Sequence, residues 1–234
     1  MAWFPLESNP DVSCIFIESI LNVSLKSFLG NEQGVSEKWN IVDVYGLESD
    51  ALAWVPKPVL SVILLFPCSD SYYNHSTQQC NEIKEKGQVI ASDVFFLKQV
   101  VSNACGTIAL IHSVANNTDK IELTDGKFKE LLDSSKDLSP EERGELLQKV
   151  AAQIMHVHQE LAQEGQTELK PNEAVNHHFI AFVHKNGCLY ELDGRKEFPI
   201  NHGPSTPETL LEVSNNTFST VSLCLSFVQL NNIT

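Results

Sequence analysis

The sequence lacks the features that mark several large classes of protein. Its longest apolar run, Cys14–Gly30, is interrupted by Glu18, Asn22 and Lys26, so it is too short and too polar to span a bilayer. We expect it to form an amphipathic helix packed on the core; a membrane anchor is the less favoured alternative. No basic, apolar and small-residue series opens the chain as a secretory signal would.

Cysteine motifs and basic residues are also scarce. The six cysteines form no C-x-x-C pair, which argues against a zinc ribbon or a thioredoxin-type site. Without a secretory signal we expect free thiols and a cytoplasmic or nuclear location. Lys and Arg number 16 against 30 Asp and Glu, a net charge of −14. This charge repels phosphate backbones and attracts basic partners, although it would also serve solubility alone. We expect no metal, cofactor, nucleic acid or membrane partner, and a monomer.

The length of 234 residues suits one α/β domain, residues 1–234, better than two. The pattern of apolar and turn residues predicts strands and helices in mixed order. Predicted strands cover Trp39–Tyr45, Val59–Phe66, Val94–Lys98, His178–Val183 and Cys188–Leu192. Predicted helices cover Glu48–Trp54, Cys105–Ala115, Phe128–Leu132 and the stretch from the Ser139 cap to about Gln163. Ser69–Gln88 is interpreted as a loop with a short helix, and Glu164–Asn176 as a mobile loop. The whole stretch Ser139–Asn176 is expected to lie over the active site.

Cys105 follows a predicted strand and turn, and it opens an apolar helix. The N–H groups and the positive end of the helix dipole favour a thiolate at this position. Taken alone, Cys105 is better explained as an ordinary buried cysteine. A thiolate nucleophile requires an imidazole partner, and that imidazole requires a group that orients it.

A predicted hairpin supplies both partners. If Asn186 and Gly187 form a two-residue turn, His178 and Asp193 become diagonal neighbours on one face of the ribbon. Their Cβ atoms would then lie about 7–8 Å apart or less. His177 points to the opposite face, because side chains alternate along a strand. Gln99, shortly before Cys105, could donate its amide to an oxyanion together with the Cys105 N–H.

Five segments resemble the ubiquitin carboxyl-terminal hydrolases, above all their small single-domain members: Gln99–Ile108, His178–Val183, Leu189–Lys196, Trp3–Val12 and Val42–Gly46. By that resemblance, Cys105 is the nucleophile, His178 the base and then acid, Asp193 the residue that orients it, and Gln99 the oxyanion donor. The implied fold is α/β and papain-like, with a central antiparallel sheet flanked by helices and a knotted chain. The implied partner is ubiquitin or a related modifier, joined through its C-terminal glycine to small adducts or peptides. Leu6, Glu7, Asn9 and Pro10 match a segment that contacts ubiquitin in the family.

Two segments depart from the family pattern. Residues 13–37 are longer and more apolar than the family's connection to its first strand. In residues 212–234, Ser214–Thr217 is a poor helix sequence, where the family has a helix. Thr220–Gln229 alternates apolar and polar residues and predicts a strand, either inside the sheet or at its edge.

Three functional hypotheses follow from these residues. The first is an active deubiquitinating thiol protease. The second is a ubiquitin-binding module whose catalysis is impaired by the altered C-terminal segment. The third is a different papain-like acyl-transfer enzyme, which would not recognise ubiquitin.

Overall fold

The computed structural model describes residues 39–44, 48–123, 127–150, 177–218 and 226–232. Several sequence predictions lie outside these residues: the helix over Cys14–Gly30, the contact residues Leu6, Glu7, Asn9 and Pro10, the end of the helix that starts after Ser139, and the loop Glu164–Asn176. The knotted path stays a prediction for the same reason. No helix among the described residues is long and apolar enough to cross a membrane.

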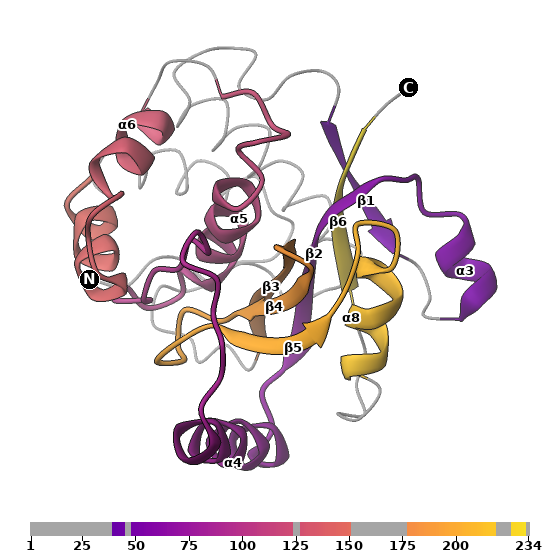
Figure 1. Ribbon diagram of the computed structural model, residues 1–234, viewed down its shortest axis with the longest axis horizontal. Helices are drawn as coiled ribbons and strands as arrows, with labels where there is room; N and C mark the ends of the chain where they lie inside the picture. The colour runs from indigo at the N-terminus through magenta and orange to yellow at the C-terminus, as the bar shows by residue number, and fades with distance from the viewer. Residues whose placement is uncertain (1–38, 45–47, 124–126, 151–176, 219–225, 233–234) are drawn as a thin grey trace, which may run out of the picture.

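A six-stranded antiparallel sheet forms the centre of the molecule (Figure 1). Its strands stand in the order β1-β6-β2-β3-β4-β5. They comprise β1 (Trp39–Val44), β2 (Val59–Pro67), β3 (His177–Lys185), β4 (Cys188–Leu192), β5 (Ile200–Pro204) and β6 (Ser226–Asn232). Strands β2 and β3 are buried over almost their whole length, which explains their nearly continuous apolar sequences. The predicted fold class, an antiparallel sheet flanked by helices, is confirmed.

Helices cover both faces of this sheet. They are α3 (Ser49–Ala53), α4 (Asp70–Lys86), α5 (Cys105–Ala115), α6 (Lys127–Ser134), α8 (Leu210–Phe218) and the helical residues 140–150. One core joins α5 and α6 to alternate side chains of the strands, such as Ile63 and Ala181. A second core joins α3, Tyr72 of α4 and α8 to the other set, such as Leu64 and Phe182. The buried helix α5, which carries Cys105, and Tyr72 of α4 therefore belong to opposite layers.

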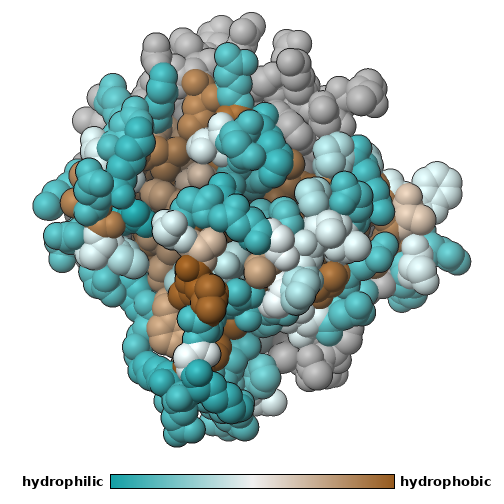
Figure 2. Space-filling model, viewed as in Figure 1, coloured by the Kyte–Doolittle hydropathy of each residue, from teal (hydrophilic) through white to brown (hydrophobic). Residues whose placement is uncertain are grey.

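The prediction for Ser69–Gln88 was wrong in its extent, because most of it forms the 17-residue helix α4. Ser69 caps the helix by accepting a hydrogen bond from the Tyr72 N–H at 3.2 Å. Gly87, at φ 75°, follows its last residue. Figure 2 shows a largely hydrophilic surface where α4 lies, at the bottom of the view. The polar composition is that of a solvent-facing helix and not that of a loop.

The prediction of a strand over Val94–Lys98 was also wrong. This segment forms neither a helix nor a strand of the sheet. The Phe95 N–H donates to Oδ1 of Asn116 at 2.8 Å, and Nδ2 of Asn116 donates to the Phe95 carbonyl at 2.9 Å. The Leu97 N–H donates to Nε2 of His112 at 3.1 Å. Side chains of α5 thus take the place of a neighbouring strand.

The C-terminal region contains a helix that the sequence does not favour and a strand whose position in the sheet the sequence left open. Ser214–Thr217 lies in helix α8, where Oγ of Ser214 donates to the Leu210 carbonyl at 2.6 Å. The buried Leu210 and Leu211 hold this helix on the sheet, so packing outweighs the weak local propensity. Strand β6 begins at Ser226 and pairs with both β1 and β2, so the edge position is excluded for these residues. Residues 219–225, the rest of the predicted strand, lie outside the described ones.

Candidate active site

Cys105 is the first residue of α5, as the sequence predicts. Asn103, two residues earlier, has φ 61°, a left-handed conformation that turns the chain sharply into the helix. Ala104 provides no side-chain cap, so the thiol meets the N-terminal end of the helix without a competing side-chain acceptor there. The rest of α5 is buried through Val114, which anchors Cys105 on a rigid element.

The β3–β4 hairpin has the predicted register. Asn186 and Gly187 both have positive φ, 49° and 80°, as a type I′ turn requires. Lys185 then faces Cys188, and Ala181 faces Leu192. This register carries His178, near the start of β3, to Asp193, just after the end of β4.

His178 and Asp193 make the contact that the hairpin predicts. Nε2 of His178 lies 2.8 Å from Oδ1 of Asp193, and the two side chains are only 0% and 2% exposed. The Arg195 N–H donates to the same oxygen at 2.9 Å. His177 lies on the other face of the strand and is half-buried, so the period of two separates these adjacent histidines correctly.

The charges of this group support one another. Burial alone would lower the pKa of His178, but the Asp193 carboxylate and the Cys105 thiol raise it to about 10. Burial would raise the pKa of Cys105, yet its interaction with His178 leaves that pKa below the usual value. Burial would likewise raise the pKa of Asp193, but His178 holds it well below its normal range. Nδ1 of His178 is buried without a hydrogen-bond partner among the described residues, which leaves it for the thiol. The site therefore favours a thiolate beside an imidazolium.

Gln99 lies beside this group on the irregular segment that precedes α5. Its Nε2 donates to the Val101 carbonyl at 3.0 Å, which fixes the orientation of the amide because only the NH₂ end can donate. One N–H of that NH₂ group is then left for another acceptor. The Gln99 backbone N–H donates to the Gly194 carbonyl at 2.8 Å.

Gly194 joins the two halves of the site. A Cβ at this position would lie 3.0 Å from Cγ2 of Ile108 and 3.1 Å from Cβ of Gln99. A side chain would therefore push the residue after Asp193 away from both α5 and Gln99. Because Gly194 has no side chain, the residue after Asp193 packs directly on Ile108 of α5 and on Gln99.

Tyr72 is a site residue that the sequence does not reveal. Its hydroxyl donates to Oδ2 of Asp193 at 3.0 Å, across 121 residues of sequence. The only local signal is the Ser69 cap, which predicts a helix start three residues earlier.

A second buried group of charges lies around Glu191. Lys196 pairs with one Glu191 oxygen, and His202 lies 2.8 Å from the other. Burial would raise the pKa of Glu191, but Lys196 and His202 lower it to about 2.

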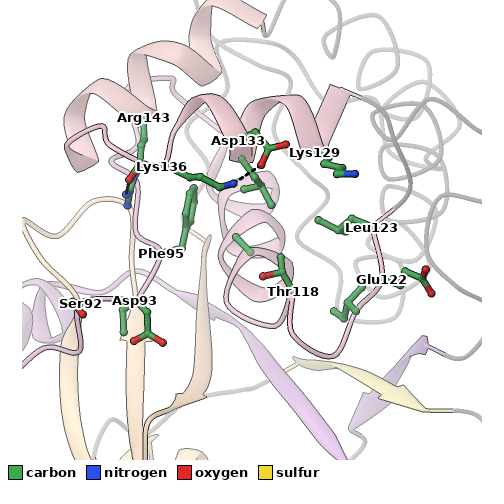
Figure 3. A pocket seen from close by; sticks show the side chains of 14 residues that line it. Ser92, Asp93, Phe95, Thr118, Glu122, Leu123, Lys129, Asp133, Lys136 and Arg143 are labelled. Atoms are coloured by element: carbon green, nitrogen blue, oxygen red, sulfur yellow. Dashed lines mark hydrogen bonds and ion pairs between the residues drawn. The ribbon is translucent and has the colours of Figure 1, made fainter.

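A separate pocket of about 550 Å³ lies between the C-terminal part of α5, α6 and residues 92–95 (Figure 3). Its wall contains the ion pair Lys136–Asp133, at 2.7 Å, and the guanidinium of Arg143, which stacks 4.7 Å from the centre of the Phe95 ring. Cys105, His178, Asp193 and Gln99 do not line it. This pocket is therefore separate from the group formed by Cys105, His178 and Asp193.

Comparison with known proteins identifies the family of this chain. Residues 3–221 match the model of the ubiquitin carboxyl-terminal hydrolase family 1. A ubiquitin carboxyl-terminal hydrolase of Drosophila melanogaster is 47% identical over 212 residues, which are 91% of this chain and 87% of the relative. The human ubiquitin carboxyl-terminal hydrolase isozyme L1 is 42% identical over 209 residues, 89% of this chain and 86% of that one.

Solved structures share the fold. The catalytic domain of Trichinella spiralis UCH37 bound to ubiquitin vinyl methyl ester aligns with a TM-score of 0.67 and 22% identity, covering 100% of this chain and 97% of that one. The family match, which spans nearly the whole sequence, and the close relatives lead to one conclusion. This chain belongs to the ubiquitin carboxyl-terminal hydrolase family 1.

Proposed function

We propose that this protein is a deubiquitinating thiol hydrolase that cleaves the bond after the C-terminal glycine of ubiquitin or a related modifier. The observation that carries the proposal is the buried group formed by Cys105, His178 and Asp193, with the His178–Asp193 contact at 2.8 Å. The names of the relatives give the substrate class. We further propose one catalytic domain over residues 1–234, which acts as a monomer in the cytoplasm or nucleus on small adducts and peptides.

Cys105 is the proposed nucleophile. Its thiolate attacks the carbonyl carbon of the terminal glycine and forms a tetrahedral intermediate. The imidazolium of His178 donates a proton to the leaving amine, the C–N bond breaks, and a thioester remains. Neutral His178 then takes a proton from water while the water oxygen attacks the thioester carbon. The C–S bond breaks, the modifier leaves as its free carboxylic acid, and Cys105 is restored as a thiolate beside the His178 imidazolium. Asp193 orients the ring and stabilises the imidazolium throughout, as in other triads.

Gln99 is the proposed oxyanion donor. In the tetrahedral intermediate the carbonyl oxygen carries a negative charge, which preorganised N–H groups stabilise. The Gln99 NH₂ group keeps one N–H after its bond to Val101, and the Cys105 backbone N–H lies at the open end of α5. Losing one such donor typically costs about 10²–10³ in kcat.

Substrate binding is proposed to involve the acidic surface and the N-terminal segment. The net charge of −14 would attract a basic tail on the modifier. By their likeness to the family's N-terminal segment, Leu6, Glu7, Asn9 and Pro10 are proposed contacts. The stretch Ser139–Asn176, which lies between the Cys105 and His178 segments in sequence, is proposed to lie over the active site and to limit the size of the leaving group.

A ubiquitin probe with a C-terminal vinyl methyl ester tests the function. The wild-type protein should form a covalent adduct at Cys105, identified by mass spectrometry, and the Cys105→Ala variant should bind ubiquitin without labelling. Binding without labelling by the wild type would support the impaired binding module instead. A wild-type protein that ignores the probe would contradict both and point to another acyl-transfer enzyme.

A further inference from the structure

The two oxygens of the Asp193 carboxylate have different partners. Oδ1 accepts from the His178 ring at 2.8 Å and from the Arg195 N–H at 2.9 Å, while Oδ2 accepts from the Tyr72 hydroxyl at 3.0 Å. A carboxylate bonded at one oxygen alone can rotate about the bond that joins it to Cβ. A donor on the far oxygen fixes the plane of the carboxylate, and with it the line along which Oδ1 meets His178.

Tyr72 is itself held firmly. It is buried, and its ring packs edge-to-face against Phe66, with ring centres 4.6 Å apart. The Phe66 ring in turn packs at 5.7 Å against the ring of His178. The Tyr72 N–H is fixed by the Ser69 cap. Burial and the nearby Asp193 carboxylate keep the pKa of Tyr72 far above its usual value, so the hydroxyl stays protonated and donates.

The position of Tyr72 within α4 also indicates that its side chain serves the contact with Asp193. Tyr72 is the buried residue of this 17-residue helix. The helix is otherwise polar and largely solvent-facing, so little else in it requires burial against the sheet (Figure 2). The Tyr72 side chain points inward, and its hydroxyl donates to the Asp193 carboxylate. It therefore contacts the candidate triad from the layer opposite to α5.

We propose that Tyr72 is a positioning residue, which orients Asp193 and thereby keeps the His178 ring in line with Cys105. The proposal rests on the proposed function of the Cys105–His178–Asp193 group, but not on the identity of the substrate. Tyr72 acts through Asp193 and contacts no reacting atom. Because its effect concerns the chemical step, it should alter kcat and not substrate binding.

Tyr72→Phe is the direct test, because it removes the hydroxyl and keeps the ring. With a fluorogenic ubiquitin substrate, kcat should fall roughly tenfold, the effect of losing about one hydrogen bond to a charged group, with KM nearly unchanged. Tyr190→Phe is the control: Tyr190 is also buried, its hydroxyl accepts from the Ala91 N–H at 3.0 Å, and it lies on β4 of the same hairpin. The control should lose thermal stability to a similar degree and keep its kcat.

Alkylation of Cys105 by iodoacetamide gives a readout that does not depend on ubiquitin. Measured by mass spectrometry of the Cys105 peptide, its rate against pH reports the thiolate fraction. Tyr72→Phe should move the midpoint of this profile to higher pH, since a loosely held Asp193 supports the imidazolium less. If ubiquitin is not the substrate, this profile still tests Tyr72. An unchanged profile with unchanged kcat, or a loss of kcat that only follows the loss of folded protein, would overturn the proposal.

A double-mutant cycle decides whether Tyr72 acts through Asp193. In an Asp193→Ala background, Tyr72→Phe should cause no further loss of kcat or of Cys105 alkylation. If it lowers both by the same factor as in the wild type, the two residues are independent and the positioning role is wrong.

Discussion

The two halves of the candidate active site are held together by different means. The proposed acid–base half, the β3–β4 hairpin with His178 and Asp193, is fixed by a regular antiparallel ladder and a two-residue turn. The proposed nucleophile half consists of α5 and the irregular segment that carries Gln99. The backbone of that segment is bonded to side chains of α5, to the Pro140 carbonyl and to Gly194.

This difference affects what a single substitution can do. In a ladder, each side chain can change without removing the backbone bonds, which depend on register alone. In the nucleophile half, the backbone of residues 95–97 depends on the side chains of Asn116 and His112. A substitution on one helix can thus release the segment that leads to Gln99, while the hairpin should tolerate surface changes.

The largest effect is expected in the hairpin half at the triad itself. His178→Ala should reduce kcat roughly 10³-fold or more, because it removes the base and the acid together. His177→Ala, at the half-buried neighbour on the other face, should change kcat little. Steady-state kinetics of both folded variants provides the check, and an equal loss in both would contradict the assignment.

Asn116→Ala should have the largest effect on the nucleophile half. It leaves the Phe95 N–H and carbonyl without partners, and each unpaired buried group costs about 1–3 kcal/mol. Because Phe95 is partly exposed, water will offset some of this, and we expect a total near 2 kcal/mol by urea denaturation. The kcat should fall as well, since the segment leads to Gln99.

Asn117→Ala is its matched control. Asn117 is equally buried, and its amide donates to the Leu60 carbonyl at 3.1 Å, on β2 and not on the Gln99 segment. It should lower stability and spare kcat. Equal kinetic losses in both variants would mean that the segment is not what links Asn116 to catalysis.

The hairpin half could be predicted from sequence because its determinants are local. Asn186 and Gly187 fix the turn, the turn fixes the register, and the register brings His178 to Asp193. The start of α5 was equally clear from its apolar run. The roles of these residues follow from the family resemblance and stay predictions until they are tested.

The parts that could not be predicted depend on contacts between distant residues. Val94–Lys98 has the composition of a strand. Its backbone, however, bonds to the side chains of His112 and Asn116, in and just after the next helix, and not to a neighbouring strand. The donor to Asp193, Tyr72, is separated from it by 121 residues and lies in a helix whose polar sequence indicates a loop. The sequence pattern of neither segment predicts these contacts, because they arise only when the helices pack against the sheet and against the segments beside it.

The charge of the acid–base half predicts a pH dependence of stability. The pKa of His178 is raised from 6.5 to about 10, so its contribution is complete below pH 6.5 and is lost as pH rises toward 10. The pKa of Asp193 is lowered from 3.8, so its contribution exists above pH 3.8 and is lost in acid. The stability advantage of the wild type over Asp193→Asn should therefore peak between about pH 4 and 6.5. Urea denaturation at pH 5.5 and 9.5 checks this, and an equal advantage at both would contradict the ion pair.

Gly144→Ala tests the packing of the nucleophile half. A Cβ on this helical residue would lie 2.3 Å from the Lys98 carbonyl oxygen, so the helix and the segment must separate. Overpacking of this kind costs about 1–3 kcal/mol. Because Lys98 directly precedes Gln99, kcat should fall together with the unfolding midpoint. An unchanged kcat in a destabilised variant would show that a shift of Lys98 does not displace Gln99.

Gly187→Ala should have the smallest effect and completes the comparison from the hairpin side. Gly187 has φ 80°, and an added Cβ would meet no atom within 4 Å, so the only penalty is the left-handed backbone, about 1–2 kcal/mol. The ladder beyond the turn should keep its register, and kcat should not change. Gly87→Ala, at φ 75° and ψ 165° with equally open surroundings at the end of α4, should cost more, because that backbone region is essentially restricted to glycine. Thermal unfolding and steady-state kinetics measure both. A fall in kcat for Gly187→Ala alone would mean that the turn, and not only the ladder, holds His178 against Asp193, and the contrast between the two halves would then be smaller than their hydrogen bonds indicate.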